Sequence, residues 1–534
     1  MPTYADVVAD VLAQSRIEYI FGVPGSLGSV ELIEAAAKRD IRYILCSNES
    51  SAAVMAGTYG ILRRRPGVCS TGVGPGAAAA VLGVTNNWLE RAPSLILTDR
   101  YSDAQFRSLE RQRVDQDLLY RPITKGTFKL AEDAAAVTLR RAVALAMEGR
   151  PGPVHVDLPY DVMLAQAPGS AFLPAPDGER HVARAGADHP GLRAAAREIA
   201  RAQRPVLIAG LQVNRSGEAA ERALLAFAER LGAPVFASPA AKGTMPEQHP
   251  LAAGTFRGRR GEQALLDKAD LLILAGYDPV EIFAPGGWSH PQPVVMLDEV
   301  PHLADLIRPR VEVVARLADS LEVLSRAVSP CRGWDTEEVE SYRKMCRAPL
   351  HPRAGGAMMP GAVIRVAREE LPDNGILTAD AGNHKVLAGD IWEGRRPLGY
   401  HSSNGLGSMA VGLPAALAAK LAEPETPVIC LTGDGGFLMR LGDLEVAARE
   451  RIPVVVIVFN DGWLSTIKLK QDDRGFRRLG TRFGACDFVS VAKGLGCEAA
   501  RVESERALKD ALAQALASWR PWVIDAVISP DGYA

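Results

Sequence analysis

Short apolar runs alternate with helical stretches through almost the whole chain of 534 residues. Examples of these runs are YIFGV, PVHVDL, LLILAG and PVVVIVFND, and most of the runs are continuously apolar, which is typical of parallel strands covered on both faces. The alternation of strands and helices predicts βαβ units, and therefore an α/β fold built from doubly wound parallel sheets. A chain of this length is sufficient for about two to four domains, each with its own core.

Two segments interrupt this alternation. Residues 166–190 are rich in Pro, Gly and Ala and predict a linker between domains. Residues 329–360 combine a charged helical stretch with a connector rich in Pro and Gly. We therefore expect three α/β domains, at about 1–165, 190–328 and 355–534. The first and third domains could share one fold by duplication, because both place Gly-rich turns after strands.

Charge and composition narrow the classes of partner. The formal net charge is −2 with 23% charged residues, so the chain lacks the basic excess that binding to nucleic acid requires. The sequence has no run of 18 apolar residues and no signal-peptide pattern, which predicts a cytoplasmic protein without a membrane span. The seven cysteines form no C-x-x-C pair and are expected to be reduced thiols.

A carboxylate between glycines follows one apolar run, in the stretch LTGDGGFLMR at residues 431–440. A tight turn, a phosphate cradle and a metal site are three competing interpretations of this pattern. The helical stretch FLMRLGDLEVAARERI and another strand follow, and Asn460 lies 26 residues beyond Asp434. This spacing matches two parallel strands joined by a crossover helix. Both side chains are therefore expected at the carboxyl ends of adjacent strands, where ligands bind in open α/β sheets.

The polar groups expected at this edge suit Mg²⁺. Asp434 offers a carboxylate, Asn460 an amide oxygen, and Gly462 a backbone carbonyl in the turn NDGW. Hard oxygen ligands of this kind favour an octahedral Mg²⁺ that completes its shell with phosphate oxygens and water. Gly435 and Gly436 allow the backbone to approach a phosphate closely at the start of the next helix.

The motif GDGGF followed by NDG resembles the diphosphate–magnesium motif of the thiamin diphosphate enzymes. Other stretches agree over most of the chain, among them NESSAAVMAGTYG, VDQDLLYRPITK, GPVHVDLPYDV and GLGSMAVGLPAALAAKL. Together they resemble the acetolactate synthase/benzaldehyde lyase branch of that superfamily. The resemblance implies a first domain that binds the pyrimidine of thiamin diphosphate, a central domain, and a third domain that binds diphosphate and Mg²⁺.

The resemblance implies that Glu49, in CSNESS, activates the cofactor by hydrogen-bonding its pyrimidine nitrogen N1′. A water-poor pocket would strengthen this contact and raise the pKa of the glutamate. From the residues alone, Glu49 is equally a helix-start glutamate after an Asn or Ser cap, and the two interpretations are compatible. Gln112, in RQRVDQ, matches a glutamine near the cofactor in acetolactate synthases, and a solvated side chain on a charged loop is the alternative.

Other positions are implied to hold the cofactor. Met409 matches an apolar side chain that wedges beneath it, and the Gly407 carbonyl would accept its 4′-amino proton. Asn383 and His384 match positions that hold the diphosphate. Core packing for Met409 and an ordinary surface position for His384 are the alternatives. The residues implied to contact the cofactor are Gly25, Asn383, His384, Gly407, Met409, Gly433, Gly435, Gly436, Trp463 and Leu464.

The expected reaction follows from Leu27, in PGSLGS, and from the scarcity of histidine. Leu27 matches a site where benzaldehyde lyase and benzoylformate decarboxylase-like enzymes carry a polar group. Residues 1–165 contain one histidine, His155, inside an apolar run, whereas a decarboxylase needs a positioned acid. An apolar pocket favours carboligation of a 2-keto acid donor with a carbonyl acceptor. The alternatives are a non-oxidative 2-keto acid decarboxylase, a 2-hydroxyketone lyase, and a catalytically silent paralogue that binds cofactor.

The match to acetolactate synthase itself is incomplete. Arg111 and Arg113 flank Gln112, where that family has Phe-Gln-Glu, and GWLSTIKLKQDDRGF lacks the usual Gln-Trp pattern. In this segment Trp463, Leu464 and Ile467 could line a substrate pocket. Lys468 and Lys470 could meet a substrate carboxylate, although a solvated helix face explains these lysines equally well.

Two further implications concern the central domain and the assembly. The central domain has no convincing G-x-G-x-x-G, so FAD or another ADP-containing ligand is an alternative without support from the residues. In this family the glutamate and the Mg²⁺ site come from different subunits. The resemblance therefore implies an obligate dimer or a tetramer with shared active sites.

Overall fold

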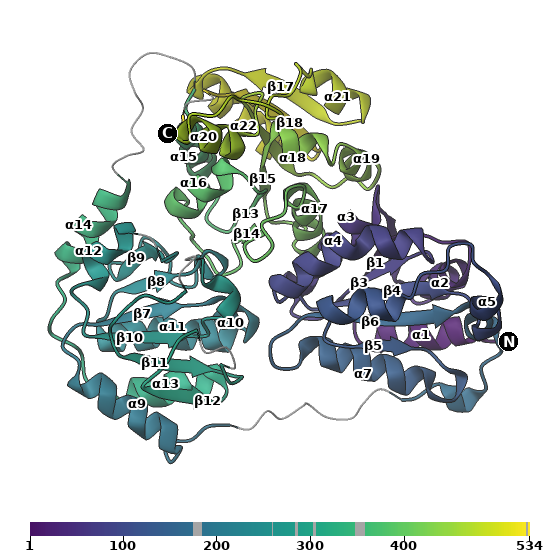
Figure 1. Ribbon diagram of the computed structural model, residues 1–534, viewed down its shortest axis with the longest axis horizontal. Helices are drawn as coiled ribbons and strands as arrows, with labels where there is room; N and C mark the ends of the chain where they lie inside the picture. Colours follow the sequence, from purple (N-terminus) through teal and green to yellow (C-terminus); the bar gives the residue numbers. More distant parts are fainter. Residues whose placement is uncertain are drawn as a thin grey trace.

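The computed structural model describes residues 1–174, 184–258, 260–283, 287–302, 306–347, 358–529 and 532–533. Part of each predicted connecting segment lies outside the described residues, and so does the expected start of the third domain. The described residues form three sheets of six strands, and every strand pairing in them is parallel. Figure 1 shows the sheets as three lobes with helices packed on both faces, so the predicted doubly wound α/β fold is confirmed.

The first lobe is built on the strand order β2-β1-β3-β4-β6-β5. Strands β3 and β6 are buried along their whole length, although β3 ends in Ser70 and Thr71 and β6 contains His155 and Asp157. The strands are β1 (Tyr19–Val23), β2 (Arg42–Leu45), β3 (Gly67–Thr71), β4 (Ser94–Arg100), β5 (Thr127–Lys129) and β6 (Pro153–Pro159), and the helices are α1 (Tyr4–Gln14), α2 (Gly28–Ala37), α3 (Glu49–Arg63), α4 (Pro75–Leu89), α5 (Asp103–Ser108), α6 (Gln116–Tyr120), α7 (Ala135–Met147) and α8 (Tyr160–Leu164).

The middle lobe is built on the order β12-β11-β10-β7-β8-β9. Its strands β7, β10 and β11 are fully buried. The strands are β7 (Pro205–Ala209), β8 (Val235–Ala237), β9 (Ala252–Thr255), β10 (Leu271–Ala275), β11 (Val294–Asp298) and β12 (Val311–Val314), and the helices are α9 (Pro190–Arg201), α10 (Leu211–Arg215), α11 (Glu218–Leu231), α12 (Gln263–Leu266), α13 (Leu317–Ala327) and α14 (Thr336–Arg347).

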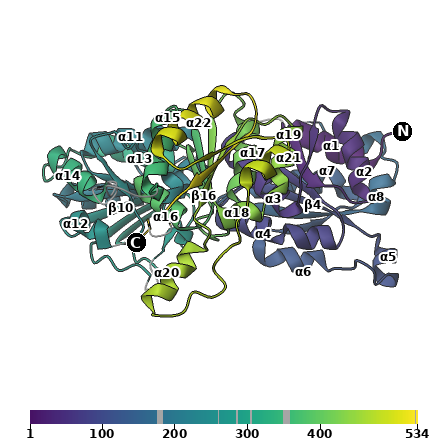
Figure 2. The ribbon, with the colours of Figure 1, turned by 90° about the horizontal axis from the view of Figure 1, so that it is seen from above.

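The third lobe is built on the order β14-β13-β15-β16-β18-β17. Figure 2 shows that its helix α20 projects from the body of the lobe. The strands are β13 (Ile376–Ala379), β14 (Tyr400–Ser402), β15 (Val428–Gly433), β16 (Val455–Asn460), β17 (Glu498–Val502) and β18 (Trp522–Val527), and the helices are α15 (Pro360–Glu370), α16 (Asn383–Ile391), α17 (Gly412–Ala422), α18 (Asp434–Leu438), α19 (Gly442–Arg449), α20 (Ser465–Asp473), α21 (Phe488–Gly494) and α22 (Glu505–Ala517).

The first and third lobes share one topology. If the strands are renumbered within each lobe, both sheets have the order 2-1-3-4-6-5, whereas the middle sheet has the order 3-2-1-4-5-6. The expectation that the two outer domains share a fold is therefore confirmed. In such sheets the chain adds strands first on one side of strand 1 and then on the other. Ligands bind at the carboxyl edge where this direction reverses.

The single helix that we expected after Asp434 is divided in the structure. Helix α18 begins at Asp434 itself, and α19 starts after a short turn. The turn brings the backbone against the first lobe: a Cβ atom on Gly442 would lie 2.9 Å from the Cβ of Ser47. Next to it, the buried Asp443 carboxylate accepts hydrogen bonds from the hydroxyls of Ser47 and Ser51, the latter at 2.8 Å. A continuous helix would not make these contacts between lobes.

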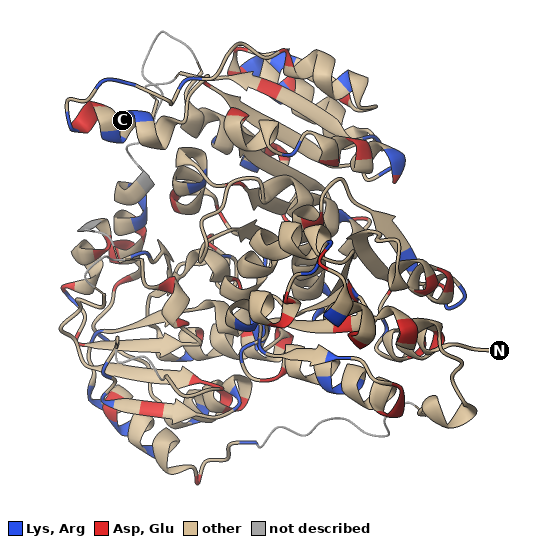
Figure 3. Ribbon diagram, turned by 45° about the vertical axis from the view of Figure 1, so that its right-hand side comes forward, with Lys and Arg blue, Asp and Glu red and all other residues tan. Residues whose placement is uncertain are grey.

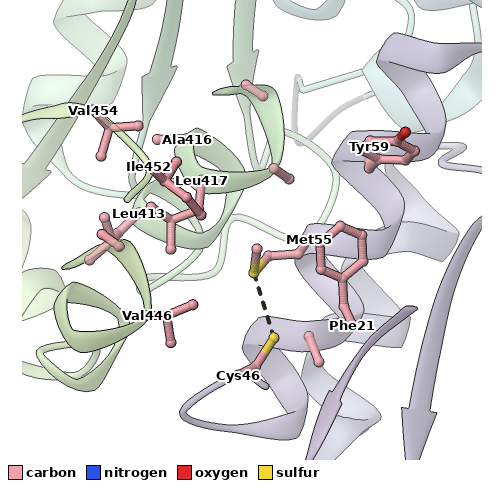
Figure 4. Packing of buried hydrophobic residues seen from close by; sticks show 14 of the residues in the cluster. Phe21, Cys46, Met55, Tyr59, Leu413, Ala416, Leu417, Val446, Ile452 and Val454 are labelled. Carbon is pink, nitrogen blue, oxygen red and sulfur yellow. Dashed lines mark hydrogen bonds between the residues drawn. The ribbon is translucent and has the colours of Figure 1, made fainter. Parts of the chain in front are cut away.

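A hydrophobic cluster joins the first and third lobes. Figure 4 shows Met55, on α3, facing Leu413 and Leu417, on α17. The Cys46 sulfur lies 3.7 Å from the Met55 sulfur in the same cluster. Helix α3 is buried at every position from Ser50 to Leu62, so it forms part of the core shared by both lobes. No helix formed by the described residues is long and apolar enough to cross a membrane.

An ion-pair cluster joins the first and middle lobes. The Asp278 carboxylate, which is fully buried, is paired with Arg91 at 3.0 Å and with Arg150 at 2.9 Å. Arg150 also reaches Asp298 at 3.2 Å. Burial raises the pKa of Asp278, but hydrogen bonds and charge from the two arginines outweigh it and hold this pKa below its usual value. Elsewhere, Figure 3 shows acidic and basic residues intermixed over all three lobes.

We expect Asp278→Asn to lower the free energy of unfolding by about 3 kcal/mol, because it leaves two arginines without their shared buried charge. The folded-state pKa of Asp278 is depressed. The advantage of the wild type is therefore complete above the unfolded-state pKa, about 3.9, and disappears as the pH falls through the folded value. Urea unfolding from pH 7 to pH 3 measures this difference.

The control is Asp103→Asn, which removes an exposed ion pair with Lys129 and should change the free energy of unfolding by less than about 1 kcal/mol. Equal effects of the two substitutions would show that the buried cluster contributes no more than a surface pair.

Candidate active site

A pocket of about 340 Å³ opens at the carboxyl edge of the third sheet. It lies where the strand order reverses between β13 and β15. Asn383 and His384 begin α16 directly after β13, and Gly433 to Gly436 join β15 to α18. The volume is within the range of small-molecule sites. The lining residues are Ala381, Gly382, Asn383, His384, Gly407, Met409, Gly433, Asp434, Gly435, Gly436, Phe459, Asp461, Trp463, Leu464, Ser465, Thr466, Ile467 and Tyr533.

Two buried nitrogens at this edge have no hydrogen-bond partner among the described residues. The Asn383 side-chain nitrogen and the Nε2 atom of His384 are both buried and make no hydrogen bond. The Asn383 oxygen accepts a hydrogen bond from Thr466 at 2.7 Å, which turns the nitrogen away from that contact. His384 stacks on Phe459 at 5.2 Å and is not at the surface, so the surface alternative for it is wrong. Burial lowers the pKa of His384 to about 3, which leaves the ring neutral.

The glycines after β15 bring the backbone close to its neighbours. A Cβ atom on Gly436 would overlap the Asp380 carboxylate, so the turn requires glycine there. A Cβ atom on Gly435 would lie 2.8 Å from the Phe483 ring. Helix α18 has only five residues, which is too short to form an anion site by itself. The candidate site therefore consists of the glycine turn together with the unpartnered nitrogens of Asn383 and His384.

Asp434 and Asn460 follow the ends of the apolar runs of β15 and β16, which pair in parallel, and of the predicted metal ligands Asp434 alone lines the pocket in the described residues. Asp434 is buried, and its carboxylate accepts hydrogen bonds from the amides of Gly462 at 2.7 Å and Gly435 at 2.6 Å. The Asn460 side-chain nitrogen donates a hydrogen bond to Asp525 at 2.8 Å, which leaves the amide oxygen of Asn460 as the group for a metal. Gly462 has φ +75°, a left-handed conformation that favours glycine.

Negative charge at this position favours a cation. Burial, followed by the charge of Asp461, raises the pKa of Asp434 to about 7. Among the described residues no three His, Cys, Asp or Glu side chains cluster as metal ligands. A site made of one carboxylate, one amide oxygen and one carbonyl fits Mg²⁺, which takes few protein ligands and completes its shell with phosphate and water.

The segment after the NDG turn supplies one wall of the pocket. Trp463, Leu464 and Ile467 all line it, as the sequence suggested for a substrate pocket. The two lysines of α20 differ: Lys468 is buried and pairs with Asp472 at 3.6 Å, whereas Lys470 is exposed. The solvated-face interpretation therefore holds for Lys470 and is wrong for Lys468.

Gly407 and Met409 line the pocket from the loop between β14 and α17. Gly407 has φ +67° and open space at its Cα. Met409 is half-buried and faces the pocket, so core packing does not describe its position.

Glu49 is the first residue of α3 and follows β2 in the first lobe. The Asn48 side chain caps the helix by accepting the Ser50 amide at 2.8 Å, so the helix-start interpretation of Glu49 is confirmed. Its carboxylate lies near the turn after β3, where a Cβ atom on Gly76 would be 3.3 Å from the Glu49 Oε1 atom. Glu49 is half-buried and is not among the residues that line the pocket of the third lobe.

Leu27, Gly25 and Gln112 also lie at the carboxyl edge of the first sheet. Leu27 precedes α2 and is half-buried. A Cβ atom on Gly25 would lie 2.7 Å from the Gly72 Cα atom and would overlap the buried Asp99 carboxylate. Gln112 is exposed, with φ +56°, and accepts a hydrogen bond from Tyr101 at 3.4 Å. These residues thus lie on the lobe of Glu49, away from the pocket of Asp434.

Sequence reasoning missed several lining residues. Asp461 is adjacent to Asn460, and its place in the turn was a usable signal. Phe459 ends the apolar run of β16, where its contact with His384 has no signature in the sequence. Tyr533 lines the same pocket although it lies far along the chain from the glycine turn. Its neighbours 530, 531 and 534 lie outside the described residues.

The corresponding edge of the middle sheet carries an ion pair to the first lobe. Its order reverses between β7 and β10, where a Cβ atom on Gly210 would overlap the carbonyl oxygen of Gly276. Asp278 lies directly beyond β10, and the arginines Arg91 and Arg150 from the first lobe cover it. This interdomain ion pair lies at the edge where ligands bind in open α/β sheets, so FAD stays an alternative without support from the described residues.

Three models of one family match the chain. The N-terminal thiamine pyrophosphate binding domain matches residues 2–118, the central domain of these enzymes residues 192–324, and the C-terminal binding domain residues 380–526. A probable acetolactate synthase large subunit of Methanocaldococcus jannaschii is 29% identical, over 98% of this chain and 92% of its own length. An acetolactate synthase of Mycobacterium leprae is 30% identical, over 99% of this chain and 87% of its own.

A solved structure has the same overall fold. It is the thiamine diphosphate-dependent 4-hydroxybenzoylformate decarboxylase of Rhodococcus jostii RHA1, with a TM-score of 0.85. The likeness covers 99% of this chain and 100% of that chain, at 23% sequence identity.

We expect Asp434→Asn to weaken binding of inorganic diphosphate with Mg²⁺ by at least about tenfold, because it removes the only charged ligand of the three. Isothermal titration of the full chain with diphosphate at fixed Mg²⁺ measures the affinity. Asp510→Asn, at an exposed position on α22 of the same lobe, is the matched control. Unchanged affinity in Asp434→Asn would mean that the metal binds elsewhere.

Proposed function

Since this chain belongs to the thiamine pyrophosphate enzyme family, we propose that it is a thiamin diphosphate- and Mg²⁺-dependent carboligase of acetolactate synthase type. Its substrates would be a 2-keto acid donor and a carbonyl acceptor. The alternative within the family is a 2-keto acid decarboxylase or a 2-hydroxyketone lyase. We place the pyrimidine-binding domain at 1–165, the central domain at 190–328 and the diphosphate-binding domain at 355–534.

The residues of the third lobe fit the diphosphate and the metal. The unpartnered side-chain nitrogen of Asn383 would donate to a diphosphate oxygen, and His384 Nε2 would do so in the tautomer that carries the proton there, beside the backbone turn from Gly433 to Gly436. Asp434, Asn460 and Gly462 would hold Mg²⁺ between the protein and the diphosphate. These groups would suit an anionic ligand such as a diphosphate.

The remaining residues would set the chemistry of the cofactor. When bound, thiamin diphosphate supplies a carbon nucleophile that adds to the keto group and accepts the electron pair left by CO₂. The Glu49 carboxyl would hold a proton at the pyrimidine ring nitrogen, and the Gly407 carbonyl would accept a proton from its amino group. Met409 would press on the cofactor from the apolar wall of the pocket. Gln112 would lie near the substrate.

The observation that favours carboligation over decarboxylation is the burial of His155. It is the only histidine in residues 1–165, it is fully buried, and its Nε2 atom lies 2.7 Å from the Thr98 hydroxyl. This histidine is therefore sealed inside the first sheet and cannot deliver a proton to a substrate. Asp99 is screened by the backbone of Gly25, and Leu27 offers an apolar side chain instead. The lack of an accessible histidine beside Leu27 in residues 1–165 favours attack on a second carbonyl over protonation.

With pyruvate, thiamin diphosphate and Mg²⁺, we expect acetolactate to appear as pyruvate is consumed, because the buried His155 cannot protonate the donor-derived carbon. Proton NMR follows both compounds, with protein lacking the cofactor as the control. Acetaldehyde without acetolactate would contradict carboligation and favour the decarboxylase. Unchanged pyruvate would exclude it as the donor and direct the search to larger 2-keto acids.

We further propose that the enzyme is a dimer or a tetramer with shared active sites. The pocket around Asp434 is lined only by residues between 381 and 533, and Glu49 does not reach it within one chain. A Glu49 side chain from a second copy would complete the site. The third lobe would then bind the diphosphate while the partner's first lobe contacts the pyrimidine.

Co-expression of Glu49→Gln and Asp434→Asn chains tests this arrangement. Each variant alone should be inactive. Random pairing gives mixed dimers for half of the population, each with one intact site, so the mixture should regain about a quarter of wild-type activity. Turnover in tag-purified mixed dimers measures the recovery. No recovery in such dimers would show that both residues act within one chain.

A further inference from the structure

The loop between β14 and α17 carries Gly407 and Met409, and each half of it is fixed by a different carboxylate. In the second half, the buried Asp380 carboxylate accepts the amides of Ala410 and Val411, each at 2.9 Å. Asp380 belongs to the same lobe and follows β13 directly. Contacts within the third lobe therefore fix the second half of the loop but not the first half.

The first half of the loop is held from another lobe. One oxygen of the Glu90 carboxylate accepts the amides of Asn404 at 2.6 Å and Gly405 at 2.7 Å. Glu90 is the C-cap residue of α4 in the first lobe, and it is 8% exposed. Hydrogen bonds from two amides to one buried carboxylate are short and strong. They fix the backbone only two residues before Gly407.

Packing at this point leaves no room for movement of the loop toward α4. A Cβ atom on Gly405 would lie 2.8 Å from the Leu89 Cβ atom and 2.9 Å from its carbonyl oxygen. Inside the loop, the Ser408 amide donates to the Ser403 hydroxyl at 3.1 Å, and Lys385 donates to the Ser403 carbonyl at 2.7 Å. The loop is thus a closed, hydrogen-bonded turn seated on the end of α4.

The middle lobe completes the junction. The Arg215 guanidinium donates to the carbonyl oxygens of Glu90 at 3.0 Å and Arg91 at 3.2 Å. Burial raises the pKa of Glu90, while the two amides and the charges of Arg215 and Lys385 oppose that shift. All three lobes therefore meet at the end of α4, directly beside the loop of Gly407.

We propose that Glu90 is a positioning residue that fixes the Gly407–Met409 loop in the shape that receives the pyrimidine end of the cofactor. This inference rests on the proposed function. It assigns to the first lobe a second role besides carrying Glu49: within the same chain, it shapes the pocket of the third lobe. The diphosphate end of the pocket, at Asn383 and Asp434, makes no contact with Glu90 and should be independent of it.

The test compares two ligands, thiamin diphosphate and inorganic diphosphate, each titrated with Mg²⁺ into the full chain. Glu90→Ala should weaken binding of thiamin diphosphate about tenfold and leave binding of diphosphate unchanged, since only the former uses the loop. Glu90→Gln keeps an oxygen that can accept both amides, so it should recover part of the affinity. Hydrogen exchange of the Asn404 and Gly405 amides should accelerate in Glu90→Ala.

Glu221→Ala is the matched control. Glu221 is also 8% exposed, and it joins the first and middle lobes through Arg64 at 2.9 Å without touching the loop. Equal loss of thiamin diphosphate affinity in both alanine variants would overturn the inference and reduce Glu90 to an interface residue. Equal weakening of both ligands in Glu90→Ala would overturn it as well.

If Glu90→Ala does not fold, Gly405→Ala perturbs the same contact from the side of the loop, by its steric overlap with Leu89. It should give the same selective loss, and unchanged affinity for thiamin diphosphate would overturn the inference. Failure of the proposed function would give a different result. The wild-type chain would then bind thiamin diphosphate no more tightly than inorganic diphosphate, because the pyrimidine would add no affinity.

Discussion

Parallel pairing of β15 with β13 on one side and β16 on the other is the constraint on which the site depends. The register places Gly433 opposite Phe459 and Leu431 opposite Ala379, so three turns emerge at one edge. Those turns carry the unpartnered donors, the glycine backbone and the metal ligands. Because parallel strands need crossover helices, the turns also start helices, and their amides point toward the same space. No other part of the site could assemble without this pairing.

Buried carboxylates connect the lobes at the points where the site needs rigid backbone. Asp443 holds Ser47 and Ser51, which flank Glu49, and Glu90 holds the loop before Gly407. A carboxylate can accept several hydrogen bonds at once, so a single side chain can hold two donors of another lobe in place. Burial of these groups is costly unless every oxygen is occupied, so the connections also specify one arrangement of the lobes.

The fold and the metal turn could be predicted from the sequence because their signals are local. Continuous apolar runs indicate buried strands, and the spacing from Asp434 to Asn460 follows from one crossover helix. Contacts between distant elements have no such signal. The burial of Lys468 depends on what packs over α20, and the break before α19 depends on the first lobe approaching Gly442. Glu90 is an ordinary polar residue at a helix end until the third lobe is placed beside it.

The two outer lobes have one topology but distribute different chemistry over it. In the third lobe the turns at the reversal point carry donors for an anion, whereas in the first lobe the same edge carries Leu27, Gly76 and a glutamate that begins α3. Under the proposed function neither edge is complete, because the third-lobe edge lacks Glu49 and the first-lobe edge lacks the nitrogens of Asn383 and His384. Helix α3 is packed against the third lobe of its own chain and cannot swing toward that lobe's pocket without breaking the core. Under the proposed function, a chain therefore fixes the position of a glutamate that serves its partner, and the same domain contacts that stabilise one subunit determine catalysis in the other.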